Sequence, residues 1–444
     1  MSERPPSDPH ELRREIGPFA SVLITVGAMV GSGIFVTPHY VALLVRSATA
    51  TWLLWLAGGA LTLLGALSFV ELGAALPETG GMYVYLRRAF GPVAAFAFAW
   101  SMTMVLVPSS VGFFASVAAE HLSVILRVPT RHTTALTVGV IGVLLGVNLG
   151  GVRQSAWLQG SVTLAKVVGV LLLAVGGLFV RRQGAPLALP LSSEPGALPW
   201  VNTLAALVPV LWSYDGWVDV TSVAGEVRSP GRNVPRSLVV GTVLVAGLYL
   251  LANVTYLRVM GPAALAQSAT PAADAAALAF GARGRTVVSL LVALSTFGGC
   301  AVALLTGSRV IYAVARDGLF LPAFARTSAR GVPSVALVAS CVLAVLYVSS
   351  PVGDLANVFV IGAWPFYALA AVATVRLRSR EPALARPYRT PGYPWTPVVF
   401  AAVSLGVVAS YGITQPWQLG MSVGIIALGG PVYGWYAWQL RRGR

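Results

Sequence analysis

Two short glycine-containing segments interrupt apolar stretches of the sequence, and both have the chemistry to hold a small charged solute. Residues 31–33 read Gly-Ser-Gly in the first stretch, and residues 214–217 read Tyr-Asp-Gly-Trp in the sixth. A helix broken at these points leaves backbone groups that lipid cannot satisfy, which is tolerated only beside a cavity. N–H groups after Gly33 suit a carboxylate, and free carbonyls near the second break suit an ammonium group. One site with both features fits a zwitterionic amino acid.

The residue types at the first break support this interpretation. A side chain at Gly31 or Gly33 would hold a bound carboxylate away from the backbone, and the Ser32 hydroxyl could add a donor. The alternative is that these are ordinary small residues that pack membrane helices together. The corresponding break in the sixth stretch favours binding.

Lys166 is the single lysine of the chain and lies in the middle of the fifth apolar stretch. It is roughly 16 Å from the expected cytoplasmic end of that helix, too far for easy snorkelling to the headgroups. An ionisable residue inside the membrane is a functional hypothesis by default. Its ammonium could stand where other transporters hold a sodium ion, bridging the first and fifth helices. The alternative is a structural lysine bonded to backbone carbonyls.

Five further polar or aromatic residues lie in the sixth stretch, the loop after it or the seventh stretch. Asp215 and Asp219 should share a helix face, and either could border the cavity or transfer a proton. Asp215 is favoured because it is at the break itself, whereas Asp219 could be a satisfied polar residue or line a vestibule. Trp212 could close over a solute, and Tyr249 lies in the seventh stretch, although membrane aromatics are often packing or belt residues. Glu226 opens a basic loop and predicts an internal salt bridge or gate.

The composition predicts an all-α integral membrane protein. Of 444 residues, 56% are hydrophobic and 10% are charged, against about 25% charged in average soluble domains. Each apolar segment is long enough to cross a bilayer. The net charge of +15 sits in short gaps between these segments, which argues against nucleic-acid binding. We expect twelve transmembrane helices, at about 16–45, 50–76, 92–119, 133–150, 155–180, 200–225, 236–258, 286–313, 334–349, 353–376, 396–413 and 419–440.

No catalytic or metal-binding pattern is present in the sequence. Cys300 and Cys341 both lie in apolar runs and predict no disulfide framework. The four histidines match no metal spacing. We expect no metal, no cofactor and no enzymatic activity.

Arginines concentrate in the segments that an inside N-terminus places inside, which predicts cytoplasmic termini and an even number of helices. The two breaks are five helices apart, as in an inverted repeat whose discontinuous helices face one midplane site. We therefore expect one membrane domain over residues 1–444, with repeats at about 16–180 and 200–378 and an accessory helix pair at about 396–440.

Five motifs, in order, resemble those of the amino acid–polyamine–organocation superfamily, and most closely its L-type and cationic amino-acid transporters and their bacterial relatives. Residues 30–35 read V-G-S-G-I-F. Residues 71–72 and 77–83 read E-L and P-E-T-G-G-M-Y. The other three motifs are E-V-R-S-P-G-R-N-V-P-R at 226–236, S-R and A-R-D-G at 308–318, and R-P-Y-R-T-P-G-Y-P at 386–394.

The resemblance implies a LeuT-type fold and a role for each matching residue. Gly31, Ser32, Gly33 and Ile34 match the family's carboxylate-binding turn; Trp212 matches its aromatic gate; Tyr214, Asp215 and Gly216 match its unwound sixth helix. Lys166 and Tyr249 match a lysine site associated with sodium-independent transport.

These observations together predict a sodium-independent secondary transporter of amino acids in the inner or plasma membrane, working by exchange or with protons. A polyamine or amine permease and a non-transporting amino-acid sensor are the alternatives. We expect membrane lipid and an amino-acid substrate as partners. No covalent glycoprotein partner is expected, because neither cysteine lies in an extracellular loop.

Overall fold

The structure is a computed structural model that describes residues 14, 16–78, 80–126, 128–150, 152–180, 200–268, 270–328 and 331–442. Thr79 of the second sequence motif lies outside the described residues. Within them the chain is helical apart from turns and one isolated bridge between Ile16 and Val227. The helices are α1 (Pro18–Met29), α2 (Gly33–Val45), α3 (Ala48–Ala75), α4 (Met82–Phe90), α5 (Pro92–Ser101), α6 (Val107–Leu126), α7 (Thr133–Leu149), α8 (Val152–Leu178), α9 (Trp200–Ser213), α10 (Asp219–Ser222), α11 (Pro230–Val259), α12 (Gly261–Gln267), α13 (Pro271–Arg316), α14 (Ser334–Tyr347), α15 (Val352–Arg380), α16 (Trp395–Thr414), α17 (Pro416–Ala427) and α18 (Gly429–Arg442).

Eight helical stretches among the described residues are long and apolar enough to cross a membrane, and three shorter apolar helices accompany them. A helix satisfies its own backbone, so it is one of the few structures that can span lipid. Large apolar side chains such as Leu172, Leu244 and Leu405 are exposed on the outer faces, where lipid rather than water would cover them. The predicted all-helical, multi-pass membrane class is confirmed.

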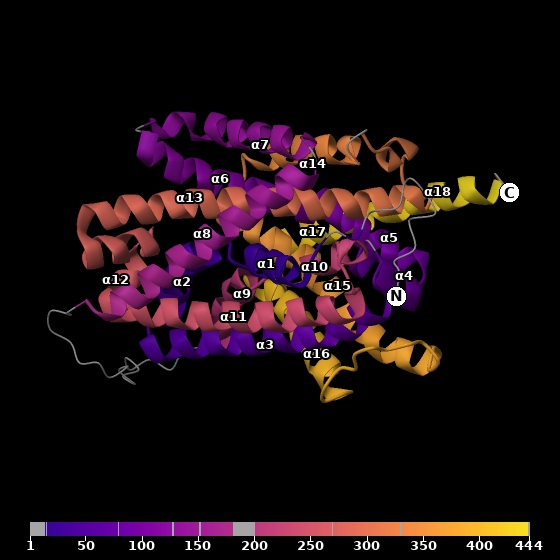
Figure 1. Cartoon of the computed structure of the whole chain (residues 1–444), viewed down its shortest axis with the longest axis horizontal. Coiled ribbons are helices and arrows are strands. Elements are labelled where there is room, and N and C mark those ends of the chain that lie inside the picture. Colours follow the sequence, from indigo (N-terminus) through magenta and orange to yellow (C-terminus); the bar gives the residue numbers. More distant parts are fainter. Residues whose placement is uncertain are drawn as a thin grey trace.

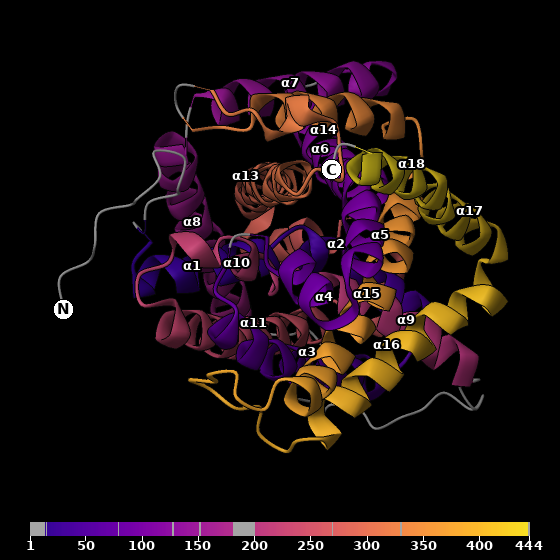
Figure 2. The same cartoon turned by 90° about the vertical axis from the view of Figure 1, so that its right-hand side faces the viewer.

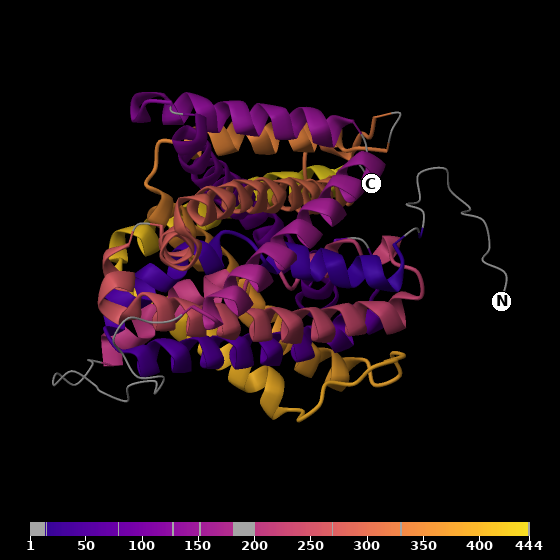
Figure 3. The ribbon, with the colours of Figure 1, turned by 60° about the vertical axis from the view of Figure 1, so that its left-hand side comes forward.

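The helices form a bundle around two broken helices. The long helices α3, α11 and α13 follow the long axis, and α1 and α10 lie between them (Figure 1). Viewed along that axis, α7 and α14 pack together at the upper edge, and α18, α17 and α16 follow one another down the right-hand side (Figure 2). α8 crosses the bundle obliquely beside α1 and α11 (Figure 3).

Several element bounds differ from the sequence prediction. The expected twelfth helix at 419–440 is two helices, α17 and α18, that meet at Leu428. The expected eighth helix is the second part of α13, which Gly281 breaks with a φ of +71°. The third apolar stretch contains a π-helical turn, Met102–Leu106, between α5 and α6. Such turns are rare and often lie at functional sites.

Candidate functional site

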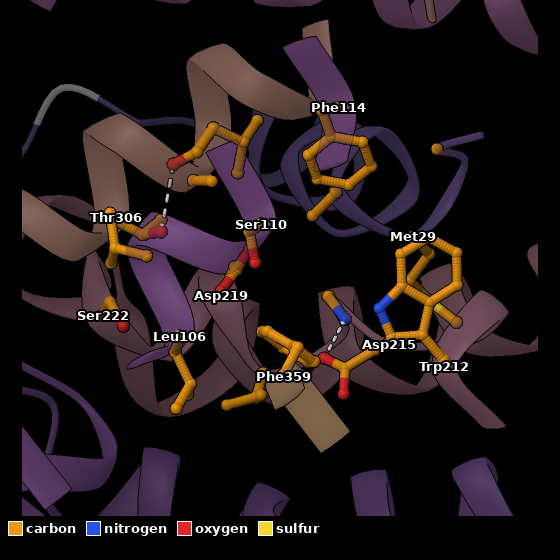
Figure 4. Close-up of a pocket in the computed structure, with 18 of the residues that line it drawn as sticks. Met29, Leu106, Ser110, Phe114, Trp212, Asp215, Asp219, Ser222, Thr306 and Phe359 are labelled. Carbon is orange, nitrogen blue, oxygen red and sulfur yellow. Dashed lines mark hydrogen bonds between the residues drawn. The ribbon is translucent and has the colours of Figure 1, made fainter. Parts of the chain in front are cut away.

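An interior cavity of about 100 Å³ lies where the two broken helices cross. Its size suits a small solute rather than a single water molecule. In Figure 4, Met29, Trp212 and Asp215 lie on one side of it and Ser110, Asp219, Ser222 and Thr306 on the other, with Phe114 between. The lining residues come from α1, α2, α4, α5, the π turn, α6, α9, the turn after α9, α10, α13 and α15.

The first break separates α1 from α2. Helical geometry stops at Met29 and resumes at Gly33. The first N–H groups of a helix have no partner within that helix, and those of α2 start beside the cavity, which Gly31 and Gly33 line. A Cβ at Gly33 would lie 2.7 Å from the Ser213 Cα. Only glycine therefore permits this contact between α2 and α9.

The second break separates α9 from α10 and crosses the first. α9 ends at Ser213 and α10 begins at Asp219. Gly216, in the intervening turn, has a φ of +101°, which favours glycine. A Cβ there would lie 2.7 Å from the Ala28 carbonyl carbon and oxygen. The two breaks thus contact each other through backbone.

Two carboxylates face the cavity. The Asp215 Oδ1 accepts hydrogen bonds from the Gly216 N–H at 2.5 Å and from the Tyr367 hydroxyl at 2.9 Å. Its Oδ2 is buried without a hydrogen-bond partner among the described residues. Asp219 also lines the cavity, and neither carboxylate forms an ion pair within the described part of the chain. A buried carboxylate is costly unless a cation or donors compensate it, so the cavity is suited to a positively charged group.

Two aromatic rings, Trp212 and Phe114, line one end of the cavity, and Phe113 packs behind them. The Phe113 and Trp212 rings are edge to face with centroids 4.4 Å apart. The Phe114 ring lies 6.3 Å from Trp212 between centroids. Trp212 is therefore held in an aromatic cluster at the cavity, as expected of a residue that could close over a solute.

Lys166 lies behind the first break, fully buried, and binds its carbonyls. Its Nζ donates to the Gly27 carbonyl at 2.9 Å and to the Val30 carbonyl at 2.8 Å. The Tyr249 hydroxyl donates to the Met29 carbonyl at 2.7 Å. Ser295, on α13, places its hydroxyl 3.3 Å from the Val30 carbonyl oxygen. Three helices thus satisfy the carbonyls that the break leaves free.

Some of the predicted site residues line the cavity, and the others are buried behind the residues that line it. Gly31, Gly33, Trp212, Asp215 and Gly216 line it. The other five predicted residues are fully buried and are not among the described lining residues. Lys166 and Tyr249 lie behind the first break, and the remaining three are Ser32, Ile34 and Tyr214.

Tyr214 points away from the cavity. Its hydroxyl donates to the Trp55 carbonyl at 3.1 Å, and its ring packs against Trp55 and Tyr249. Any direct contact of residue 214 with a solute would therefore involve its backbone.

Sequence reasoning missed several residues from other helices. Ser110 and Phe114 of α6, Thr306 of α13 and Tyr367 of α15 all line the cavity. No local signal separates these residues from ordinary residues of apolar helices. Their selection depends on how distant helices pack.

The end of the bundle near α4 is held by buried polar contacts. The Arg309 Nε donates to the Glu226 Oε1 at 2.9 Å, and both side chains are under a tenth exposed. This confirms the internal salt bridge predicted for Glu226. Beside it, the Ile16 N–H donates to the Glu226 carbonyl at 2.9 Å and the Arg228 N–H to the Ile16 carbonyl at 2.8 Å. At the surface of this end, hydrogen bonds from Arg88 lower the pKa of Glu381.

An all-helical chain with many apolar spans and a cavity at two broken helices has the architecture of a membrane transporter rather than an enzyme. The family profile described as amino acid permease matches residues 16–433. The chain therefore belongs to the amino acid permease family, part of the superfamily that its motifs resemble.

Several known transporters are similar to the chain over most of its length. The b(0,+)-type amino acid transporter 1 of Mus musculus is 33% identical, covering 92% of this chain and 84% of the relative. The Asc-type amino acid transporter 1 of Homo sapiens is 30% identical, covering 95% and 82%. The serine/threonine exchanger SteT of Bacillus subtilis is 28% identical, covering 95% and 96%.

Proposed function

We propose that this permease is a sodium-independent secondary transporter of amino acids that works by alternating access, as an exchanger or a proton-linked carrier. The α-carboxylate of the substrate would bind the N–H groups at the start of α2, beside Gly31 and Gly33. Its α-ammonium would lie near the second break, where Asp215 has an unpartnered oxygen. Trp212 would close over the bound molecule.

The observation that carries sodium independence is the position of Lys166. Its Nζ lies 2.9 and 2.8 Å from the carbonyl oxygens of Gly27 and Val30. Carbonyls freed by a broken helix are the groups that coordinate sodium in transporters of this architecture. An ammonium fixed on the same oxygens would satisfy them as hydrogen-bond acceptors and stabilise the unwound segment without a metal ion.

We further propose twelve membrane crossings arranged as a LeuT-type inverted repeat of five helices, in the inner or plasma membrane. The eight long spans, the three shorter apolar helices and the α17–α18 pair would supply the crossings. The arginine distribution supports both termini in the cytoplasm. We expect no disulfide-linked partner, because Cys300 and Cys341 are both buried.

A second candidate function is permeation of amines or of cationic amino acids. Asp215 and Asp219 both line the cavity without a protein cation among the described residues. Two uncompensated carboxylates would favour a substrate with more than one positive charge. A non-transporting sensor would bind the same solutes without moving them.

Uptake of labelled amino acids into proteoliposomes separates these functions. External sodium is replaced by choline, and a panel of amino acids and polyamines is loaded inside in turn. Uptake that persists in choline and rises with internal amino acid supports a sodium-independent exchanger. Uptake that requires sodium refutes the proposed role of Lys166. Polyamine uptake alone favours an amine permease, and binding without uptake favours a sensor.

A further inference from the structure

The Phe114 ring occupies a slot between two glycines from different helices. A Cβ built at Gly31, in the first break, would lie 3.2 Å from the ring, and one built at Gly299, on α13, would lie at the same distance. Both distances are tighter than ordinary carbon contacts, so a side chain at either position would displace the ring by a few tenths of an ångström. The ring therefore packs directly on the backbone beside which the substrate carboxylate is proposed to bind.

The aromatic cluster restricts movement of this ring. Phe114 contacts Phe113 edge to face, with centroids 5.7 Å apart, and Phe113 packs on Trp212. Phe113 is almost fully buried and is absent from the described cavity lining, whereas Phe114 is part of that lining. The Phe114 ring is thus an apolar wall of the cavity (Figure 4), and the Phe113 ring packs beside it.

The rest of the cavity wall offers a different chemistry. Ser110 lies one turn from Phe114 on the same face of α6. Asp219 and Thr306 lie on the same side of the cavity as Ser110 in Figure 4. The Thr306 hydroxyl donates to the Val302 carbonyl, which leaves its oxygen free to accept. From the proposed carboxylate site beside Gly31, a substrate side chain would thus meet the Phe114 ring in one direction and polar groups in another.

We propose that Phe114 is a specificity-determining residue that directs the substrate side chain toward Ser110, Asp219 and Thr306. The ring excludes bulky aromatic or branched side chains that need the space beside Gly299, and admits unbranched polar ones. This inference rests on the proposed amino-acid transport and adds the class of side chain accepted.

The test compares four variants in the proteoliposome exchange assay: Phe114→Ala, Gly299→Ala, the double variant, and Phe113→Ala as the matched control. Phe113→Ala also removes an aromatic ring that packs on Trp212, but Phe113 is not among the described residues that line the cavity. Phe114→Ala should raise the rate for phenylalanine and leucine relative to serine by about tenfold or more, the scale on which apolar pockets discriminate side-chain size. Phe113→Ala should leave that ratio near its wild-type value.

Gly299→Ala gives the opposite perturbation, because its methyl group adds bulk to a residue that lines the cavity and meets the Phe114 ring at 3.2 Å. It should lower uptake of the wider substrates most, and this effect should be much smaller in the double variant, where no ring is displaced. A double-mutant cycle of this kind measures the coupling of the two residues directly. Equal effects of Gly299→Ala with and without Phe114 would overturn the proposal.

Two outcomes separate this inference from the proposed function. A wild-type protein that exchanges amino acids, with an unchanged substrate profile in Phe114→Ala, refutes the role of Phe114 alone. A wild-type protein that moves no amino acid refutes the transport function itself. If Phe114→Ala does not fold, Phe114→Leu and thermal stabilisation of the purified protein by each amino acid give the same ranking, and an unchanged ranking refutes the proposal.

Discussion

Replacing Lys166 with methionine should remove the hydrogen bonds that stabilise the first break while keeping most of the side-chain bulk. The substitution removes the donor to two carbonyls. The Val30 oxygen keeps the Ser295 hydroxyl at 3.3 Å, whereas no other hydrogen bond to the Gly27 oxygen is seen in the described residues. One unsatisfied buried acceptor costs about 1–3 kcal/mol. If that cost falls on the transport-competent arrangement, exchange drops between about fivefold and about 150-fold.

The assay is exchange of a labelled amino acid in proteoliposomes, in choline and in sodium. Lys166→Met should be slow in both, because the methionine fills the space. Lys166→Ala leaves room beside the oxygens of Gly27, Val30 and Ser295, and hard cations prefer oxygen ligands. Sodium should therefore restore part of its rate. Wild-type rates and wild-type ion dependence in both variants would remove Lys166 from the mechanism.

Three other substitutions test the site and its support. Gly33→Ala should abolish exchange and lower the thermal unfolding midpoint, because its Cβ would meet the Ser213 backbone at 2.7 Å and such overpacking costs about 1–3 kcal/mol; an active, stable variant would contradict this contact. Arg309→Met leaves the nearly buried Glu226 carboxylate unpaired and should destabilise the protein by about 3–5 kcal/mol in chemical unfolding, whereas the variant that also replaces Glu226 with Gln should recover much of that loss. Asp215→Asn should weaken binding of amino acids without unfolding the protein, measured by substrate-induced thermal stabilisation; unchanged affinity would exclude Asp215 as the ammonium partner.

The sequence predicts the features whose signal is local. Glycines in an apolar stretch predict both breaks, and the lone lysine in mid-membrane predicts a buried functional cation. Glu226 in its basic loop predicts an internal salt bridge, which the contact with Arg309 confirms. In each case the unusual residue stands out against its own neighbours.

The partners of these residues could not be predicted in the same way. Phe114, Ser295 and Tyr367 sit in apolar helices, and their distinction arises only when α6, α13 and α15 pack against the breaks. Tyr214 shows the converse: it belongs to the broken segment, but the turn directs its hydroxyl to the Trp55 carbonyl. The π turn at Met102–Leu106 has no pattern in the sequence that predicts it.

Under the proposed alternating-access mechanism, the contacts of the half-helices indicate which parts would move together. The segment with α1 meets the segment with α10 at two places: Ala28 of α1 packs on Gly216, just before α10, and Ile16, just before α1, forms a bridge with Val227, after α10. α2 is joined to α9 where Gly33 meets Ser213.

The four half-helices therefore form two pairs, with the cavity at the junction between them. Lys166 of α8 and Tyr249 of α11 belong to neither pair and bind carbonyls at this junction. They could therefore stabilise the unwound backbone while the two pairs change their relative orientation. The Arg309–Glu226 ion pair links the 3-10 turn that follows α10, Ala224–Glu226, to α13. Motion of α1 with α10 must therefore either break that pair, at the cost of two buried charges, or carry the adjoining end of α13 with it.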